Sequence, residues 1–186
     1  MYSVELMVEE HDNILRLLAV IRKACCGILE GREVDDGDFR TVIAFARNYA
    51  DKHHHGKEEQ ILFKEMTERL GAIGVNLIQH GMLVEHDLGR LHITNLEKAL
   101  DQYKEEPQTL HKLSILAEAM GYANLLQRHI DKENQIIFTY AEKNLPADIL
   151  ESVDSRVRAF EAEAQRNNVQ EAHLSALRVL TEKYGV

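Results

Sequence analysis

Histidine and glutamate residues recur along this sequence at spacings that can direct two side chains at one metal ion. His54 and Glu58 are four residues apart, and His129 and Glu133 repeat that spacing. On a helix, residues four apart lie on one face about 6 Å apart along the axis, so each pair can aim an imidazole and a carboxylate at a common point. Both groups are ligands that iron, manganese and zinc accept. The spacing therefore indicates metal binding.

These pairs belong to an internal repeat with an offset of 75 residues. The segment MVEEHD at 7–12 matches MLVEHD at 82–87 at four of six positions, and HHGKEEQILF at 54–63 matches HIDKENQIIF at 129–138 at six of ten. The repeat aligns three pairs of residues: His11 with His86, His54 with His129, and Glu58 with Glu133. Two blocks that share one offset predict two similar halves.

The elements that must position these residues are long helices. Glycine and proline residues and capping residues predict breaks between them. The expected helices cover residues 3–30, 38–70, 75–104 and 107–143. Short connections make consecutive helices antiparallel, so we expect an all-α, up-down-up-down four-helix bundle over residues 1–146.

Each expected helix carries one histidine on its inward-facing apolar stripe, and the second and fourth helices add a glutamate. A single core histidine is usually a structural residue, but six buried polar side chains repeated at one offset would be very costly without a ligand. The expected metal ligands are His11, His54, Glu58, His86, His129 and Glu133.

Six protein ligands suit two metal ions bridged by the two carboxylates, with solvent completing the coordination. The repeat assigns one histidine pair to each ion and both glutamates to the bridge: His11 with His54, His86 with His129, and Glu58 with Glu133. The triplet His53 to His55 leaves a second register open, because His55 and Glu59 are also four apart. The repeat favours His54 and Glu58, since the second half has no shifted counterpart.

Residues 147–186 have no counterpart in the repeat. Two further helices are expected there, over 147–165 and 169–184. We expect this extension to pack on the bundle as a cap. The alternative is a homodimer interface.

The overall composition narrows the class of partner. With 31 acidic and 22 basic residues the formal net charge is −9, which argues against nucleic acid and anionic membranes. No signal peptide pattern and no apolar run of membrane-spanning length is present. The two cysteines, Cys25 and Cys26, are adjacent, where a mutual disulfide would be strained, so we expect a reducing, cytoplasmic location.

The motifs together resemble the hemerythrin-like, HHE cation-binding family over roughly residues 5–143. The residues that carry the resemblance are the E-H-D around His11, HHGKEEQILF, MLVEHDLGR and HIDKENQIIF. The resemblance implies a four-helix bundle with a non-haem di-iron centre that meets O2, NO or peroxide. Ferritin-like bundles instead carry E-x-x-H, and none of the ten histidines here has a glutamate three residues before it.

The sequence departs from the oxygen-carrying members that it resembles. They need a fifth histidine at the position of Met82, and their last carboxylate is an aspartate five residues on rather than Glu133. The resemblance therefore implies an extra open coordination position, which favours reactivity over simple reversible O2 carriage.

We therefore expect a di-iron protein that binds, senses or reduces a small oxidant, in oxidative or nitrosative stress or iron homeostasis. Manganese and zinc are alternative metals. Enzymatic turnover stays open, because it requires an electron donor that the sequence does not show. The alternative function is a metal-stabilised helical interaction or regulatory protein without redox turnover.

Four other residues are candidates for a role at the site. Glu10 and Glu85 directly precede ligands, and each is expected in a salt bridge, with a proton relay beside the metals or an extra ligand as the alternative. Tyr122 is either a packed core residue or a hydrogen-bond donor to a metal-bound ligand. Gly89 stands where the first half has Ile14, so it either opens a gap beside the metals or permits close helix packing.

Overall fold

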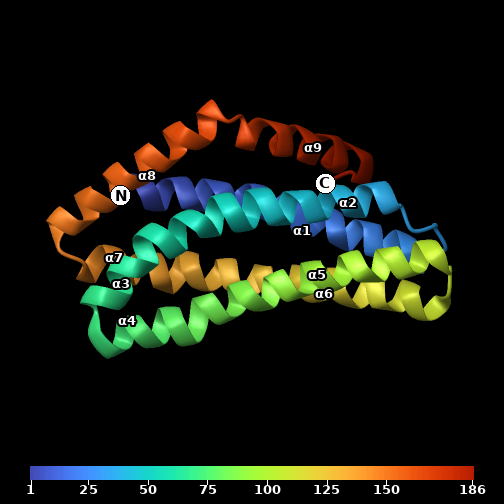
Figure 1. Cartoon of the computed structure of the whole chain (residues 1–186), viewed down its shortest axis with the longest axis horizontal. Coiled ribbons are helices and arrows are strands. Elements are labelled where there is room, and N and C mark those ends of the chain that lie inside the picture. The colour runs from blue at the N-terminus through green and yellow to red at the C-terminus, as the bar shows by residue number, and fades with distance from the viewer.

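The computed structural model describes the backbone of all 186 residues and every side chain except that of Val169. The described residues are helical apart from short connections and contain no strand (Figure 1). In chain order the elements are α1 (Tyr2–Leu29), α2 (Asp36–Phe45), η1 (Ala46–His55), η2 (Glu58–Leu62), α3 (Phe63–Arg69), α4 (Gly71–Leu77), η3 (Ile78–Met82), α5 (Leu83–Glu105), α6 (Thr109–Lys132), η4 (Glu133–Ile137), α7 (Phe138–Asn144), α8 (Ala147–Arg166) and α9 (Val169–Tyr184).

The first four long helices form the antiparallel bundle that the sequence predicts. They are α1, α2 to α3, α4 to α5, and α6 to α7, where each η element is a π-helical stretch inside a longer helix. The first helix packs against α6, α6 packs against α5, and α5 packs against α2 and η1. The contact of η1 with α1 closes the ring (Figure 1). The expected all-α fold is confirmed.

Three helix starts differ from the expected ones. The second long helix begins at Asp36 because Asp35 caps it, accepting a hydrogen bond from the Asp38 amide. The third begins at Gly71 rather than after Gly74, and Gly74 lies inside α4, where a Cβ would collide with the Met66 carbonyl oxygen. The fourth begins at Thr109, so Pro107 lies in the connection rather than in the first turn.

π-Helical turns contain ligand positions on the second and fourth long helices, and one ends a turn before the ligand of the third. The element η1 contains the histidine triplet, η2 begins at Glu58, η3 ends four residues before His86, and η4 begins at Glu133. A π turn holds more residues than an α turn, so the angle between consecutive side chains is smaller. Neighbouring residues in η1 can therefore all face buried surroundings.

The apolar interior is divided into two clusters. One contains residues such as Ile14, Ala50 and Leu96, and the other contains Met7 and Phe138. Along each long helix the expected ligands lie where one cluster gives way to the other, although on the fourth helix Ile130 of the first cluster lies between His129 and Glu133. The ligands thus form a polar layer across the middle of the bundle.

The C-terminal helices lie lengthwise on the bundle. The helices α8 and α9 contact α1, and they also contact η2 and α2 on the second long helix (Figure 1). Val153 and Val157 of α8 join one apolar cluster, and Leu177 and Leu180 of α9 join the other. The extension therefore covers the level of the polar layer from outside. A domain boundary at residue 146 stays a prediction.

Within the described part of the chain, no helix has both the length and the apolar character needed to cross a bilayer.

Candidate metal centre

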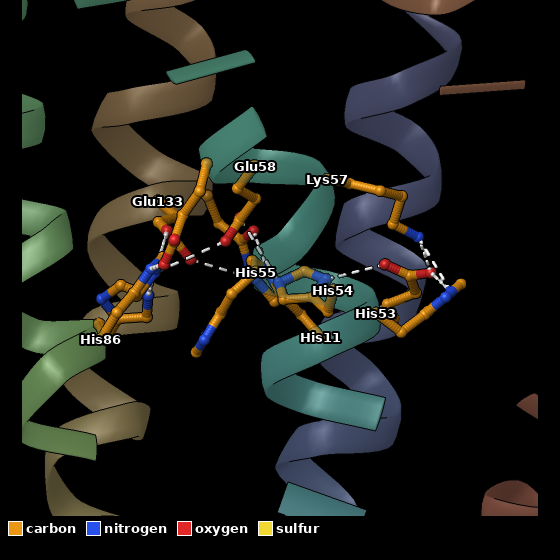
Figure 2. A network of polar contacts seen from close by, with 12 residues as sticks. His11, His53, His54, His55, Lys57, Glu58, His86 and Glu133 are labelled. Carbon is orange, nitrogen blue, oxygen red and sulfur yellow. Dashed lines mark hydrogen bonds and ion pairs between the residues drawn. The ribbon is translucent and has the colours of Figure 1, made fainter. Parts of the chain in front are cut away.

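The structure brings all six expected ligands together and adds a seventh residue, His55. Two groups of side chains could each hold an ion, with the ligand atoms of each group within 4.8 Å of one another. The first group is His11, His54, Glu58 and Glu133, and the second is His55, Glu58, His86 and His129. Figure 2 shows Glu58 and Glu133 side by side between His86 on one side and His11 and His54 on the other.

Each carboxylate faces one histidine of each group. Glu58 lies with Oε1 3.5 Å from His54 Nε2 and with Oε2 3.6 Å from His86 Nε2. Glu133 lies with Oε2 3.2 Å from His11 Nε2 and with Oε1 3.1 Å from His129 Nε2. Two donors about 2.1 Å from one ion are roughly 3 Å apart when they are adjacent in its coordination shell. The separations therefore suit two ions with the carboxylates between them.

Most polar atoms at the centre lack a hydrogen-bond partner, which is expected where a metal ion would bind. Among the described side chains, the fully buried atoms without a hydrogen-bond partner are Nε2 of His11 and His54, both ring nitrogens of His55, and all four carboxylate oxygens of Glu58 and Glu133. Leaving a buried polar atom unpaired costs about 1–3 kcal/mol, and more when it is charged. Cations between these atoms would remove that cost.

The outward ring nitrogen of each of the four predicted histidines is held by an oxygen. The Nδ1–H of His54 donates to Glu10 at 2.8 Å, and that of His129 donates to Glu85 at 3.0 Å. The Nδ1–H of His11 donates to Asn134 at 2.8 Å, and that of His86 donates to Glu59 at 2.7 Å. Such bonds fix the tautomer, so Nε2 carries a lone pair toward the centre. The Nε2 atoms of His86 and His129 lie 3.0 Å apart, so one of them carries a proton in the metal-free centre, and bound cations would take the place of that proton.

The internal repeat extends to these supporting groups. Glu10 and Glu85 are related by the offset of 75 residues, as are Glu59 and Asn134. Glu10 is ion-paired with Lys57, and Glu85 is ion-paired with Lys132, which the same offset relates. The salt bridges expected for Glu10 and Glu85 are therefore present, and the other oxygen of each carboxylate accepts a hydrogen bond from a histidine of the centre. A role for either residue in proton transfer stays a prediction.

His55 is the residue that the repeat could not reveal, because its counterpart in the second half is Ile130. Its ring stacks on that of His86 with centroids 3.7 Å apart. His54 instead lies beside His11, with centroids 4.5 Å apart. The side chains of the triplet diverge within η1, so that His54 reaches the first group and His55 reaches the second. His55 raises the histidines around the second group to three, although Met82 occupies the position expected for a fifth histidine.

Burial and mutual charge shift the ionisation of the centre. Burial raises the pKa of Glu58 well above its usual range, and the facing Glu133 carboxylate raises it further. Burial lowers the pKa of His54 to about 4, and the neighbouring His11 acts in the same direction. Burial would also lower the pKa of His129, but Glu133 and Glu85 outweigh it and raise that pKa to about 9. The metal-free centre thus retains protons at neutral pH.

A cavity of 280 Å³ reaches the second group from the surface between η1, α5 and α6. Its inner wall includes His55, His86 and Gly89, together with Tyr122 from α6. Burial raises the pKa of Tyr122, so its hydroxyl stays protonated. Gly89 therefore lines this cavity and also permits close packing of α5 on α6, where a Cβ would lie 3.3 Å from Leu126 Cδ2, so the structure supports both of its interpretations.

Comparison with known proteins identifies one family. The model of the hemerythrin HHE cation binding domain matches residues 2–141, which is most of the chain. No curated protein and no solved structure matches the sequence.

Substitution of His55 tests whether the second group uses three histidines. We expect His55→Ala to weaken one of two bound metal equivalents by at least about tenfold, because one donor is lost from one group only. His54→Ala and Glu133→Ala should also lose metal. Metal content after gel filtration measures this, with the exposed His80→Ala as control. Full metal content and affinity in His55→Ala would show that His55 is not a ligand.

The retained protons predict a pH effect on metal uptake. Because ligands must be deprotonated, binding of Zn²⁺ at pH 7 should release about one proton or more per chain, and affinity should fall as pH is lowered. The main source is His129, whose pKa of about 9 keeps it protonated at pH 7. Calorimetric titration in two buffers with different ionisation enthalpies counts the protons. Identical heats in both buffers would contradict the expectation.

Proposed function

Because this chain belongs to the hemerythrin HHE cation-binding family, we propose that its bundle holds two iron ions bridged by Glu58 and Glu133, and that the centre binds or reduces a small oxidant such as O2, NO or peroxide. The observation that carries the proposal is the pair of His/Glu groups that share a carboxylate and bury unpartnered donor atoms. Manganese and zinc are alternatives, since imidazole and carboxylate also accept them.

The two ions would have different surroundings. His11 and His54 would hold one ion, and three histidines would hold the other: His55, His86 and His129. Iron bound there supplies one-electron redox chemistry and coordination positions for a small ligand. The side with two histidines has fewer protein donors and hence more positions open to solvent or ligand.

The residues around the ligands keep the centre organised and dry. Glu10 and Glu85 orient His54 and His129 through their Nδ1–H groups. The apolar clusters on both sides of the layer exclude bulk water, which strengthens every electrostatic contact inside. Such a site favours a small uncharged reactant over a large polar one.

The cavity beside His55 and His86 supports access by a small molecule. Gly89 and Tyr122 form part of its wall, and the Tyr122 hydroxyl can donate a hydrogen bond to a ligand there. Sustained turnover needs an external electron donor. A centre without such a donor can still sense an oxidant or remove it stoichiometrically in stress protection. The unpaired Cys25 and Cys26 support a reducing compartment such as the cytoplasm.

Anaerobic reduction followed by oxygen exposure tests the function. The iron-loaded protein is reduced without oxygen, O2 is admitted, and the visible spectrum is followed in time. We expect rapid passage to the oxidised state, and repeated turnover only when a reductant is supplied. A persistent charge-transfer band that bleaches on removal of O2 would indicate reversible binding. A centre that is silent toward O2, NO and peroxide and accepts zinc equally well would contradict the proposal.

Gly89 offers a test of the access route. A Cβ at this position would lie 3.3 Å from Leu126 Cδ2 and 3.7 Å from Tyr122 Cε2, so Gly89→Val should narrow the cavity. We expect oxidation by O2 or peroxide to slow several-fold while the metal content stays that of the unmodified chain. Stopped-flow absorbance measures the rate, and Gly81→Ala, where the new Cβ makes only ordinary contact, is the control. Unchanged rates in Gly89→Val would exclude this route.

A further inference from the structure

A buried cluster of charged and polar side chains joins the bundle to its C-terminal extension. We call it the junction cluster; its members are Glu10, His53, Lys57, Glu161 and Gln170. Three of its side chains, Glu10, His53 and Glu161, could by themselves surround a cation. Lys57 Nζ contacts all three of them, so the ammonium group already supplies the positive charge.

Lys57 is the centre of this cluster and is completely buried. Its ammonium group pairs with Glu10 of α1 and with Glu161 of α8, at 2.5 Å from Glu161 Oε1. Gln170 of α9 donates to the other oxygen of Glu161 at 2.7 Å. A buried ammonium is very costly unless it is paired. Two carboxylates therefore share one lysine, and one of them comes from outside the bundle.

The cluster reaches a metal ligand through one carboxylate. Glu10 uses Oε1 for Lys57 and Oε2 for the Nδ1–H of His54, which is 2.8 Å away. A continuous series of contacts thus runs from His54 through Glu10 and Lys57 to Glu161. In Figure 2, Lys57 and His53 lie on the side of His54 that faces away from Glu58 and Glu133.

The second half of the repeat provides an internal comparison. His129, Glu85 and Lys132 reproduce the contacts of His54, Glu10 and Lys57. The Lys132 side chain, however, is 44% exposed, whereas that of Lys57 is 0% exposed. Within the described side chains, only the first half has a carboxylate in the place of Glu161. The junction cluster is therefore an addition to one half of a symmetric centre.

We propose that Glu161 is a positioning residue of the metal centre, through which the C-terminal extension sets metal affinity on the His11 and His54 side. Without the Glu161 charge, Lys57 pairs with Glu10 alone and draws that negative charge away from the Nδ1–H of His54. A weaker acceptor makes the imidazole a less basic ligand. The loss of a nearby negative charge also disfavours a cation, so both effects weaken binding at this side.

The test compares Glu161→Gln with Glu163→Gln, an exposed position on the same helix with the same change of charge. Competition of Co²⁺ or Zn²⁺ with a chromophoric chelator resolves the two metal equivalents. This inference rests on metal binding, and we expect Glu161→Gln to weaken one equivalent about tenfold and to leave the other unchanged. Wild-type affinity for both equivalents would overturn it. So would an equal loss at both with lowered thermal stability, since that result indicates a structural role alone.

Two further measurements separate this inference from the proposed function. In the metal-free protein, the Nδ1 proton resonance of His54 should move upfield in Glu161→Gln and stay unchanged in Glu163→Gln, because the hydrogen bond weakens. This readout tests transmission from Glu161 to His54 separately from metal binding, and failure of the wild-type chain to bind metal would refute the proposed function instead. In a Lys57→Met background, Glu161→Gln should have no additional effect on affinity, and additive losses would overturn transmission through Lys57.

Discussion

Burying a layer of ionisable groups across the middle of an apolar bundle is the constraint on which the rest of this structure depends. Two carboxylates and five imidazoles meet there, and among the described side chains the inner atoms of both carboxylates and of His11, His54 and His55 have no hydrogen-bond partner. Such a layer is tolerable only if cations complete it and if each outer atom is held. The paired carboxylates, the supporting acids and the charges that balance those acids follow from this requirement.

The internal repeat explains how much of the centre could be predicted from sequence. Residues related by the offset of 75 include His11 and His86, and the structure places both in the polar layer. The bundle was predictable because long amphipathic segments with short connections allow few other arrangements. His55 was not predictable, because it has no counterpart in the second half and lies in a π-helical turn. In such a turn, α-helical spacing assigns the side chain to the wrong face of the helix. The roles of Glu10 and Glu85 stayed open because sequence does not show that each carboxylate serves two partners.

The two halves of the bundle are alike in their ligands and unlike in their surroundings. In the first half the supporting acid and its lysine are covered by α8 and α9, whereas in the second half the equivalent lysine is half exposed. The cavity approaches the centre at His55 and His86, which belong to the other group of ligands. The first difference could not be inferred from the repeat, because the extension has no counterpart in it. The second was one of two possibilities that the replacement of Ile14 by Gly89 raised.

The distribution of ligands along the chain also has a consequence for the order of events during synthesis. Each group combines residues from both halves: the first needs Glu133 in addition to His11, and the second needs His129 in addition to His55. A nascent chain that ends before residue 129 therefore has no complete group, however well its first helices have formed. Metal capture must follow translation of the fourth helix and its docking on α1. Until then, the first half supplies only three of the four residues of the first group, His11, His54 and Glu58, so any ion held there lacks part of its coordination.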